Sequence, residues 1–290
     1  MGAAGPSLAK DQAAPDAKKM ILTSFPILQD VTSDLVPIDL AVQTLTPRGQ
    51  DPHSYTPSAR DTLRLQQATL ILTWGLGLDR SIEDFIKKSQ PKASHFIVTD
   101  NVPTLTGISK GHHHGRQDPH LWQSPMRMIL IVQRLSHQLQ KTFPEHREQI
   151  DKKTKSYVTE LKKLNDHYKR EFSKIPSARK KFITPHQAFQ YLADDMGLSA
   201  ESLRGLDSQA DPSAKSIQKL IEAAKSDKFA ALFDEAGEES RLLKRLSQES
   251  HIPVLGVLYT DTLFVDDGPQ TYLQLIAHNL KTVLASLKEK

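Results

Sequence analysis

The first half of the chain alternates short apolar runs with amphipathic stretches of helical periodicity. The apolar runs, which suit buried strands, are Met20–Thr23, Leu40–Val42, Leu70–Thr73 and His95–Val98. The stretches between them, which predict helices, are Phe25–Leu35, Pro57–Gln67 and Arg80–Lys88. Strands that alternate with helices of this length indicate βαβ units and a mostly parallel sheet.

A long uninterrupted helix is predicted in the middle of the chain. No Gly or Pro occurs between Glu145 and Ile175, and the apolar residues from Ile150 to Phe172 recur at spacings of 7, 4, 3, 4 and 4 positions. Such spacings place them on one face of an α-helix. About 30 residues at ~1.5 Å each give a rod of roughly 45 Å, which is long enough to span a domain.

The alternation resumes in the second half. Predicted strands are Lys181–Thr184, Ala230–Phe233 and Val254–Leu258, and predicted helices are Gln187–Met196, Ser213–Ser226, Glu238–Ser250 and Gln270–Leu287. The predicted fold is therefore α/β, with two lobes, each a mostly parallel sheet flanked by helices, joined by one long rigid helix. We place a disordered leader at 1–17, the N-terminal lobe at 18–144, the linking helix at 145–175 and the C-terminal lobe at 176–290.

Composition narrows the possible functions. The chain of 290 residues has a formal net charge of +4, but its lysines between Lys152 and Lys181 are interleaved with acidic residues, as on a solvated helix face. No zinc-finger or P-loop pattern occurs, so we expect no nucleic-acid partner. The absence of cysteine excludes disulfides and thiolate metal sites. Residues 1–17 contain neither a basic nor an apolar targeting region, so a targeting segment is expected to be absent from this chain.

Two matching tripeptides carry the clearest chemical signal. Asp51-Pro52-His53 and Asp118-Pro119-His120 each place an imidazole after an Asp-Pro pair. Helix-start signals follow both, at Thr56-Pro57-Ser58 and at Ser124-Pro125, with proline at the first helical position. Both histidines are thus predicted on loops just ahead of helices.

His186 and Asp261 occupy comparable places in the second half, because each follows an apolar run. Ligands of open α/β sheets bind outside the carboxyl ends of the strands. Two candidates from each lobe predict a site in the cleft between them. Three imidazoles and one carboxylate, at His53, His120, His186 and Asp261, form a plausible ligand set for a divalent transition metal.

Several neighbouring residues leave alternatives open. Asp51 and Asp118 could orient an imidazole or cap their loops, and Asp51 could replace Asp261 as the carboxylate ligand. Glu235 follows a strand and could hydrogen-bond a ligand. The tract His112–His114 is either a solvated loop or a weak, transient metal-capture site. The remaining histidines are predicted to lie in strands or helices as surface or packing residues: His95, His137, His146, His167, His251 and His278.

The chain resembles a known family. The stretches that carry the resemblance are Thr46–Tyr55, Asp118–Trp122, Gly75–Asp79, Gly268–Tyr272 and His278–Leu280. From about Lys18 to Leu287 the sequence is similar to the zinc-, manganese- or iron-specific solute-binding proteins of bacterial ABC transporters. The resemblance implies two α/β lobes joined by a long helix, and metal ligands at His53, His120, His186 and Asp261.

The resemblance also implies a function. It predicts extracytoplasmic capture of one metal ion per chain by a periplasmic or membrane-anchored monomer that is not an enzyme, with delivery to an ABC permease at the membrane. His186 favours Zn²⁺ over the alternatives Mn²⁺ and Fe²⁺, because members with Glu at that position tend to be assigned to manganese. Asp79 departs from the glutamate more common in the family, and the histidine tract is short for a dedicated zinc-uptake member. A metal-dependent hydrolase and a surface adhesin are the alternatives.

Overall fold

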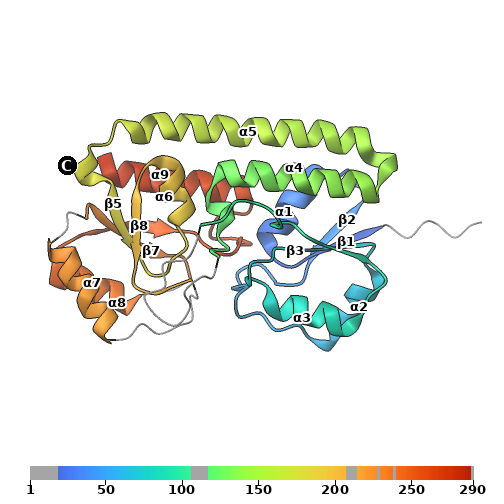
Figure 1. Ribbon diagram of the computed structural model, residues 1–290, viewed down its shortest axis with the longest axis horizontal. Helices are drawn as coiled ribbons and strands as arrows, with labels where there is room; N and C mark the ends of the chain where they lie inside the picture. The colour runs from blue at the N-terminus through green and yellow to red at the C-terminus, as the bar shows by residue number, and fades with distance from the viewer. Residues whose placement is uncertain (1–18, 106–116, 207–213, 227–228, 238–239, 289–290) are drawn as a thin grey trace, which may run out of the picture.

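The protein consists of two lobes, each built on a parallel four-stranded sheet (Figure 1). The structure is a computed structural model and describes residues 19–105, 117–206, 214–226, 229–237 and 240–288. The predicted leader at 1–17 and the tract His112–His114 lie outside the described residues. No helix among the described residues is long and apolar enough to cross a membrane.

The N-terminal lobe has the strand order β2-β1-β3-β4. Its strands are β1 (Met20–Thr23), β2 (Ala41–Thr44), β3 (Leu70–Thr73) and β4 (Ser94–Ile97), and its first helices are α1 (Pro26–Leu35), α2 (Ala59–Gln67) and α3 (Arg80–Ser89). Helix α2 begins two residues after Pro57, which is therefore not its first helical residue as predicted. Ser58 is its N-cap, and the Asp61 carboxylate accepts the Ser58 N–H at 2.7 Å.

The C-terminal lobe repeats this arrangement as β6-β5-β7-β8. Its strands are β5 (Lys181–Thr184), β6 (Ser199–Ser202), β7 (Ala231–Glu235) and β8 (Val254–Leu258), and its helices are α6 (Gln190–Met196), α7 (Ala214–Ser226), α8 (Arg241–Ser250) and α9 (Tyr272–Lys288). Strand β6 was not predicted, because an edge strand of sequence Ser-Ala-Glu-Ser carries no apolar run. His251 lies just beyond α8 rather than within it, with φ of +59°.

One long helix joins the lobes, and an antiparallel helix of the N-terminal lobe leads into it. Helix α4 (Pro125–Thr142) leads through a short 3₁₀ turn to α5 (Arg147–Ser173), which extends across both lobes (Figure 1). Only the start of α4 was predicted, and Ser124 caps it by accepting the Arg127 N–H at 3.0 Å. Helix α5 packs against α1 and α4 of one lobe and against α6 and α9 of the other. The predicted two-lobed α/β class with a linking helix is confirmed.

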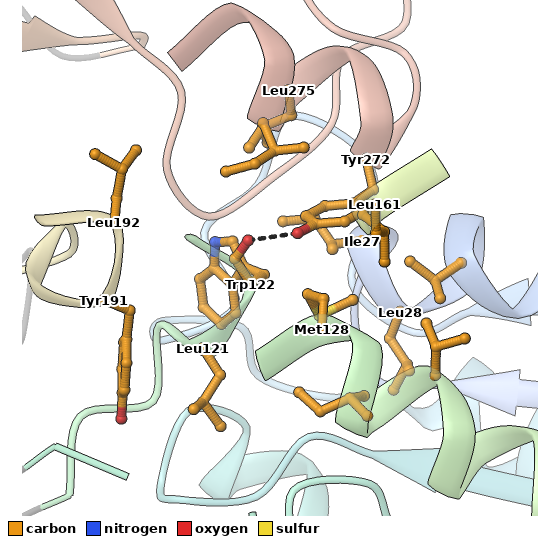
Figure 2. Packing of buried hydrophobic residues seen from close by; sticks show 14 of the residues in the cluster. Ile27, Leu28, Leu121, Trp122, Met128, Leu161, Tyr191, Leu192, Tyr272 and Leu275 are labelled. Carbon is orange, nitrogen blue, oxygen red and sulfur yellow. Dashed lines mark hydrogen bonds between the residues drawn. The ribbon is translucent and has the colours of Figure 1, made fainter. Parts of the chain in front are cut away.

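A continuous hydrophobic core crosses the junction of the lobes. Figure 2 shows side chains from α1, α4, α5, α6 and α9 gathered around Trp122. Trp122 also packs against Phe25 and Trp74, with ring centroids 5.3 and 5.2 Å away. Smaller cores lie beneath α2 and α3 in one lobe and beneath α7 and α8 in the other. Buried apolar area of this kind stabilises by roughly 25 cal/mol per Å², so the lobes are bound together by more than a single helical connection.

Candidate metal centre

The four predicted ligand residues meet where the two lobes face each other. His53 lies in a turn that follows β2, and His120 directly precedes the 3₁₀ turn Leu121–Gln123. His186 is two residues beyond the end of β5, and Asp261 is three residues beyond the end of β8. His186 and Asp261 thus lie at the carboxyl ends of parallel strands, as the rule for open α/β sheets predicts, whereas His53 and His120 reach the same place on loops.

The side-chain separations suit a single tetrahedral ion. His53 Nε2 lies 3.3 Å from His120 Nε2, and His120 Nε2 lies 3.7 Å from Asp261 Oδ1. His186 Nε2 lies 3.6 Å from Asp261 Oδ2. An ion that binds four atoms at about 2.0–2.2 Å holds neighbouring ligand atoms about 3.3–3.6 Å apart. These three separations are close to the edges of such a shell, and Asp261 uses a different oxygen in each of its two contacts.

The four residues are not equivalent in their spacing. Ligand atoms of His53, His120 and Asp261 all lie within 4.8 Å of one another, whereas His186 adjoins this group through Asp261. The rings of His186 and His120 have centroids 5.3 Å apart. Among the described residues, His186 Nε2 and Asp261 Oδ1 are buried and have no hydrogen-bond partner. Buried polar atoms without partners are unfavourable, and a bound cation would satisfy both.

Burial distinguishes an inner set of residues from an outer one. His120 is fully buried, and His186 and Asp261 are only 1% and 6% exposed. His53 is partly exposed, so it forms the solvent side of the cluster. Donor atoms shielded from water interact more strongly with an ion than exposed donor atoms do.

Carboxylates fix the orientation of two imidazoles. Asp118 Oδ1 contacts His120 Nδ1 at 2.7 Å and accepts the His120 N–H at 2.9 Å. Glu235 uses both oxygens: Oε1 accepts the His186 N–H at 3.0 Å, and Oε2 contacts His186 Nδ1 at 2.5 Å. Each contact at Nδ1 leaves Nε2 of the same ring directed at the cluster.

Asp51 has a different position from the one proposed as an alternative. Its Oδ1 accepts the His53 N–H at 2.8 Å, which stabilises the turn that presents the imidazole. Within the described part of the chain, the carboxylate grouped with His53 and His120 is that of Asp261. The geometry therefore favours Asp261 over Asp51 as the carboxylate of the centre.

The charges of the centre depend on burial and on close partners. Burial raises the pKa of Asp261 to about 6, while the imidazoles of His186 and His120 limit the rise. Burial by itself lowers the pKa of His186, but the Glu235 carboxylate outweighs it and raises the pKa to about 9. The Glu235 carboxylate thus favours the protonated form of the His186 ring when no ion is bound. A metal ion that binds its Nε2 displaces that proton.

The sequence did not predict the residues whose hydrogen bonds hold the His120 loop in place. Trp74 Nε1 donates to the Pro119 carbonyl at 2.7 Å. The buried Asp79 carboxylate accepts the N–H groups of Trp74 and Gly75 at 2.6 and 3.0 Å. Gly75 has φ of +95°, and a Cβ there would lie 2.5 Å from Ile97. The positive φ and the close approach of Ile97 both require glycine at position 75. The Gly75–Asp79 turn is therefore the sequence signal for the support of the His120 loop.

Comparison with known proteins extends these observations. The chain is 29% identical over 281 residues to the iron-binding protein YfeA of Yersinia pestis, covering 96% of this chain and 89% of the relative. It is 26% identical over 287 residues to the manganese ABC transporter substrate-binding lipoprotein PsaA of Streptococcus pneumoniae, covering 96% and 92%. The structure of a periplasmic metal-binding protein from Candidatus Liberibacter asiaticus superimposes with a TM-score of 0.84 at 25% identity, covering 93% and 100%.

The family described as zinc-uptake complex component A, periplasmic, matches residues 21–286. This match spans both lobes and includes every residue of the cluster. The chain belongs to this family of metal ABC transporter substrate-binding proteins.

Proposed function

We propose that this protein captures one divalent transition-metal ion outside the cytoplasm and delivers it to an ABC permease at the membrane. His53, His120, His186 and Asp261 are the proposed ligands. The observation that carries this proposal is the convergence of imidazole Nε2 atoms and one buried carboxylate at 3.3–3.7 Å. The names of its relatives, which include a substrate-binding lipoprotein and a periplasmic protein, support an extracytoplasmic site.

Zn²⁺ is the metal that we propose. Three nitrogen donors and one oxygen donor suit this ion, whose closed protein sites are almost always tetrahedral. The Irving–Williams order also places Zn²⁺ above Mn²⁺ and Fe²⁺ for such a donor set. Relatives named for iron and for manganese make these two ions the alternatives.

The geometry favours capture over catalysis. Four protein donors complete a tetrahedral shell, whereas catalytic zinc sites keep one position open for water or substrate. A hydrolase at this centre would need one of the four donors to stay unbound. We therefore propose a binding protein that acts as a monomer with its permease. X-ray absorption of the zinc-loaded protein would reveal a bound water if the hydrolase alternative held.

The test is a metal titration of three proteins. Wild type is expected to bind one Zn²⁺ per chain. His120→Ala should lower the affinity by about 1,000-fold or more, or about 4 kcal/mol, because a fully buried donor is lost. His137→Ala is the matched control, since His137 is an exposed imidazole on α4. Calorimetry with a competing chelator measures all three affinities.

Circular dichroism establishes that both variants fold before they are titrated. Wild-type affinity in folded His120→Ala would refute the ligand assignment. Equal losses in the two variants would mean that the measured Zn²⁺ binds elsewhere on the surface.

A further inference from the structure

Two buried side-chain amides connect the lobes directly behind the metal centre. Asn279 on α9 donates from Nδ2 to Oε1 of Gln123 at 3.0 Å. Both side chains are fully buried. Gln123 lies three residues after His120, in the 3₁₀ turn that begins at Leu121. This amide pair, which we call the Gln123–Asn279 bridge, thus begins in the loop that carries a ligand from the N-terminal lobe.

The other end of the bridge holds the Asp261 loop. Asn279 Oδ1 accepts the Tyr259 N–H at 2.9 Å, and Asn279 Nδ2 donates to the Tyr259 carbonyl at 2.7 Å. Gln123 Nε2 donates to the same carbonyl at 3.1 Å. Tyr259 is two residues before Asp261, so one buried network ties together the chain segments next to both His120 and Asp261.

Neighbouring contacts reinforce the same connection. Trp122 Nε1 donates to the Thr260 carbonyl at 2.7 Å. The Tyr272 hydroxyl in turn donates to the Trp122 carbonyl at 2.7 Å, a contact visible in Figure 2. Successive residues of the His120 loop, Trp122 and Gln123, are therefore bonded to successive residues of the Asp261 loop, Tyr259 and Thr260.

We propose that Gln123 and Asn279 are positioning residues that set the separation of His120 and Asp261 before the metal arrives. This inference rests on the proposed function and deepens it. The bridge holds His120 Nε2 and Asp261 Oδ1, which come from different lobes, 3.7 Å apart. A ligand pair that is already in place binds without the entropic cost of ordering it, so the bridge raises affinity although it does not touch the ion.

Because the hydrogen bonds of the bridge are buried, the position of the Asp261 loop is sensitive to the loss of either amide. Removing one amide leaves buried donors or acceptors of the others without partners, and such atoms are costly in the absence of water. The Tyr259 backbone would then shift to recover its hydrogen bonds, and Asp261 would move with it.

The test replaces each amide with an apolar side chain of similar size. Asn279→Leu, Gln123→Leu and the double variant are compared with wild type by Zn²⁺ affinity and by the visible absorption of bound Co²⁺. Each single variant should bind Zn²⁺ about tenfold more weakly, in the range for residues that orient ligands. The double variant should lose little more than either single variant, because the two residues form one network.

Thr154→Val is the matched control. Thr154 on α5 is also buried; its hydroxyl donates to the Ile150 carbonyl at 2.7 Å and lies 2.8 Å from the Ser136 hydroxyl on α4, away from the ligand loops. This variant should lower thermal stability while leaving Zn²⁺ affinity and the Co²⁺ spectrum as in wild type. The Asn279 and Gln123 variants should alter both, which a general loss of stability does not do.

Each result has a definite meaning. If Asn279→Leu binds Zn²⁺ no more weakly than Thr154→Val and its Co²⁺ spectrum is unchanged, the positioning role is wrong. Gln123→Leu, in a short turn rather than a long helix, decides the matter if Asn279→Leu does not fold. If wild type itself binds no Zn²⁺, Mn²⁺ or Fe²⁺ tightly, the proposed function fails, and that outcome is distinct from failure of the bridge.

Discussion

The two lobes share one strand order but build their halves of the proposed metal centre differently. In the N-terminal lobe, His53 and His120 are each supported by an aspartate two residues earlier in the same tripeptide. In the C-terminal lobe, His186 is supported by Glu235, which is 49 positions away on β7. The carboxylates that support the histidines of the N-terminal half are therefore local in sequence, whereas strand pairing brings Glu235 to His186 in the C-terminal half.

The difference follows from the distance between each residue and its strand. His186 and Asp261 lie two and three residues beyond β5 and β8, so the sheet itself places them. His53 lies nine residues beyond β2, and a loop of that length needs its own hydrogen bonds to hold a conformation. The same fold can thus present the proposed ligands either from strand ends or from loops with their own hydrogen bonds.

The sharpest test of this contrast removes the charge of each supporting carboxylate. Glu235 uses both oxygens, so Glu235→Gln must turn an NH₂ group toward an N–H donor of His186. Asp118 uses Oδ1 for both of its contacts, and its Oδ2 has no hydrogen-bond partner in the described structure. Asp118→Asn can therefore keep both contacts.

We expect Glu235→Gln to weaken Zn²⁺ binding by about 10- to 100-fold and Asp118→Asn by less than about tenfold. Chelator competition at fixed pH measures both. Equal losses would mean that the charge of the carboxylate matters more than its geometry, and the contrast between the halves would disappear.

A second variant examines metal choice in the C-terminal half. His186→Glu replaces a nitrogen donor with a hard oxygen donor and adds negative charge beside Asp261. It should narrow the preference for Zn²⁺ over Mn²⁺ by about tenfold, because carboxylate donors suit Mn²⁺ better than imidazoles do. Competitive displacement of each metal measures the ratio in wild type and variant. An unchanged ratio would show that His186 does not bind the ion.

A combined variant separates the effect of the donor atom from the effect of charge repulsion. Because Glu235 contacts His186 directly, the new carboxylate would face a like charge. His186→Glu combined with Glu235→Gln removes that repulsion. If the combined variant binds Mn²⁺ more tightly than His186→Glu alone, the weaker Mn²⁺ binding of the single variant is due to repulsion and not to the choice of donor.

The contrast also explains how much of the molecule the sequence could predict. His53 and His120 were predictable because their motifs, with supporting aspartates and helix-start signals, lie within a few residues. The βαβ alternation then predicted the carboxyl ends where His186 and Asp261 lie. The Glu235 contact to His186 was only one of several possibilities, because it depends on the neighbouring positions of β5 and β7 in the sheet.

Other features could not be predicted because they too depend on contacts between residues far apart in the sequence. The Gln123–Asn279 bridge joins residues 156 positions apart, and no local pattern distinguishes a buried amide from an exposed one. Strand β6 lacks the apolar run that identifies buried strands, because it lies at the edge of its sheet. Long-range pairing, rather than local propensity, decides such features.

A contact between the lobes that lies away from the ligands is expected to have the smallest effect. Asp30 on α1 accepts the Tyr272 N–H at the start of α9 at 2.8 Å. Burial raises the pKa of Asp30 to about 6, although this hydrogen bond opposes the rise. An exposed aspartate has a pKa of about 3.9, so protonation of Asp30 favours the folded state. That contribution is fully present below about pH 3.9 and is lost as the pH rises through about 6.

Asp30→Asn imitates the protonated carboxyl group and keeps an acceptor for the Tyr272 N–H. We expect the variant to exceed wild type in unfolding free energy by on the order of 1 kcal/mol at pH 8, and to match it at pH 4. Thermal unfolding at both pH values measures the difference, which corresponds to roughly 2–4 °C in Tm for a protein of this size. Asp84→Asn, which removes an exposed carboxylate on α3, is the control for the loss of a negative charge as such. Zn²⁺ affinity at pH 8 should stay at the wild-type value, because Asp30→Asn keeps the acceptor for the Tyr272 N–H and leaves the contact of the Tyr272 hydroxyl with Trp122 in place. A change in affinity as large as that of Asn279→Leu would mean that any contact between the lobes tunes the centre, and the two halves would then not be organised independently.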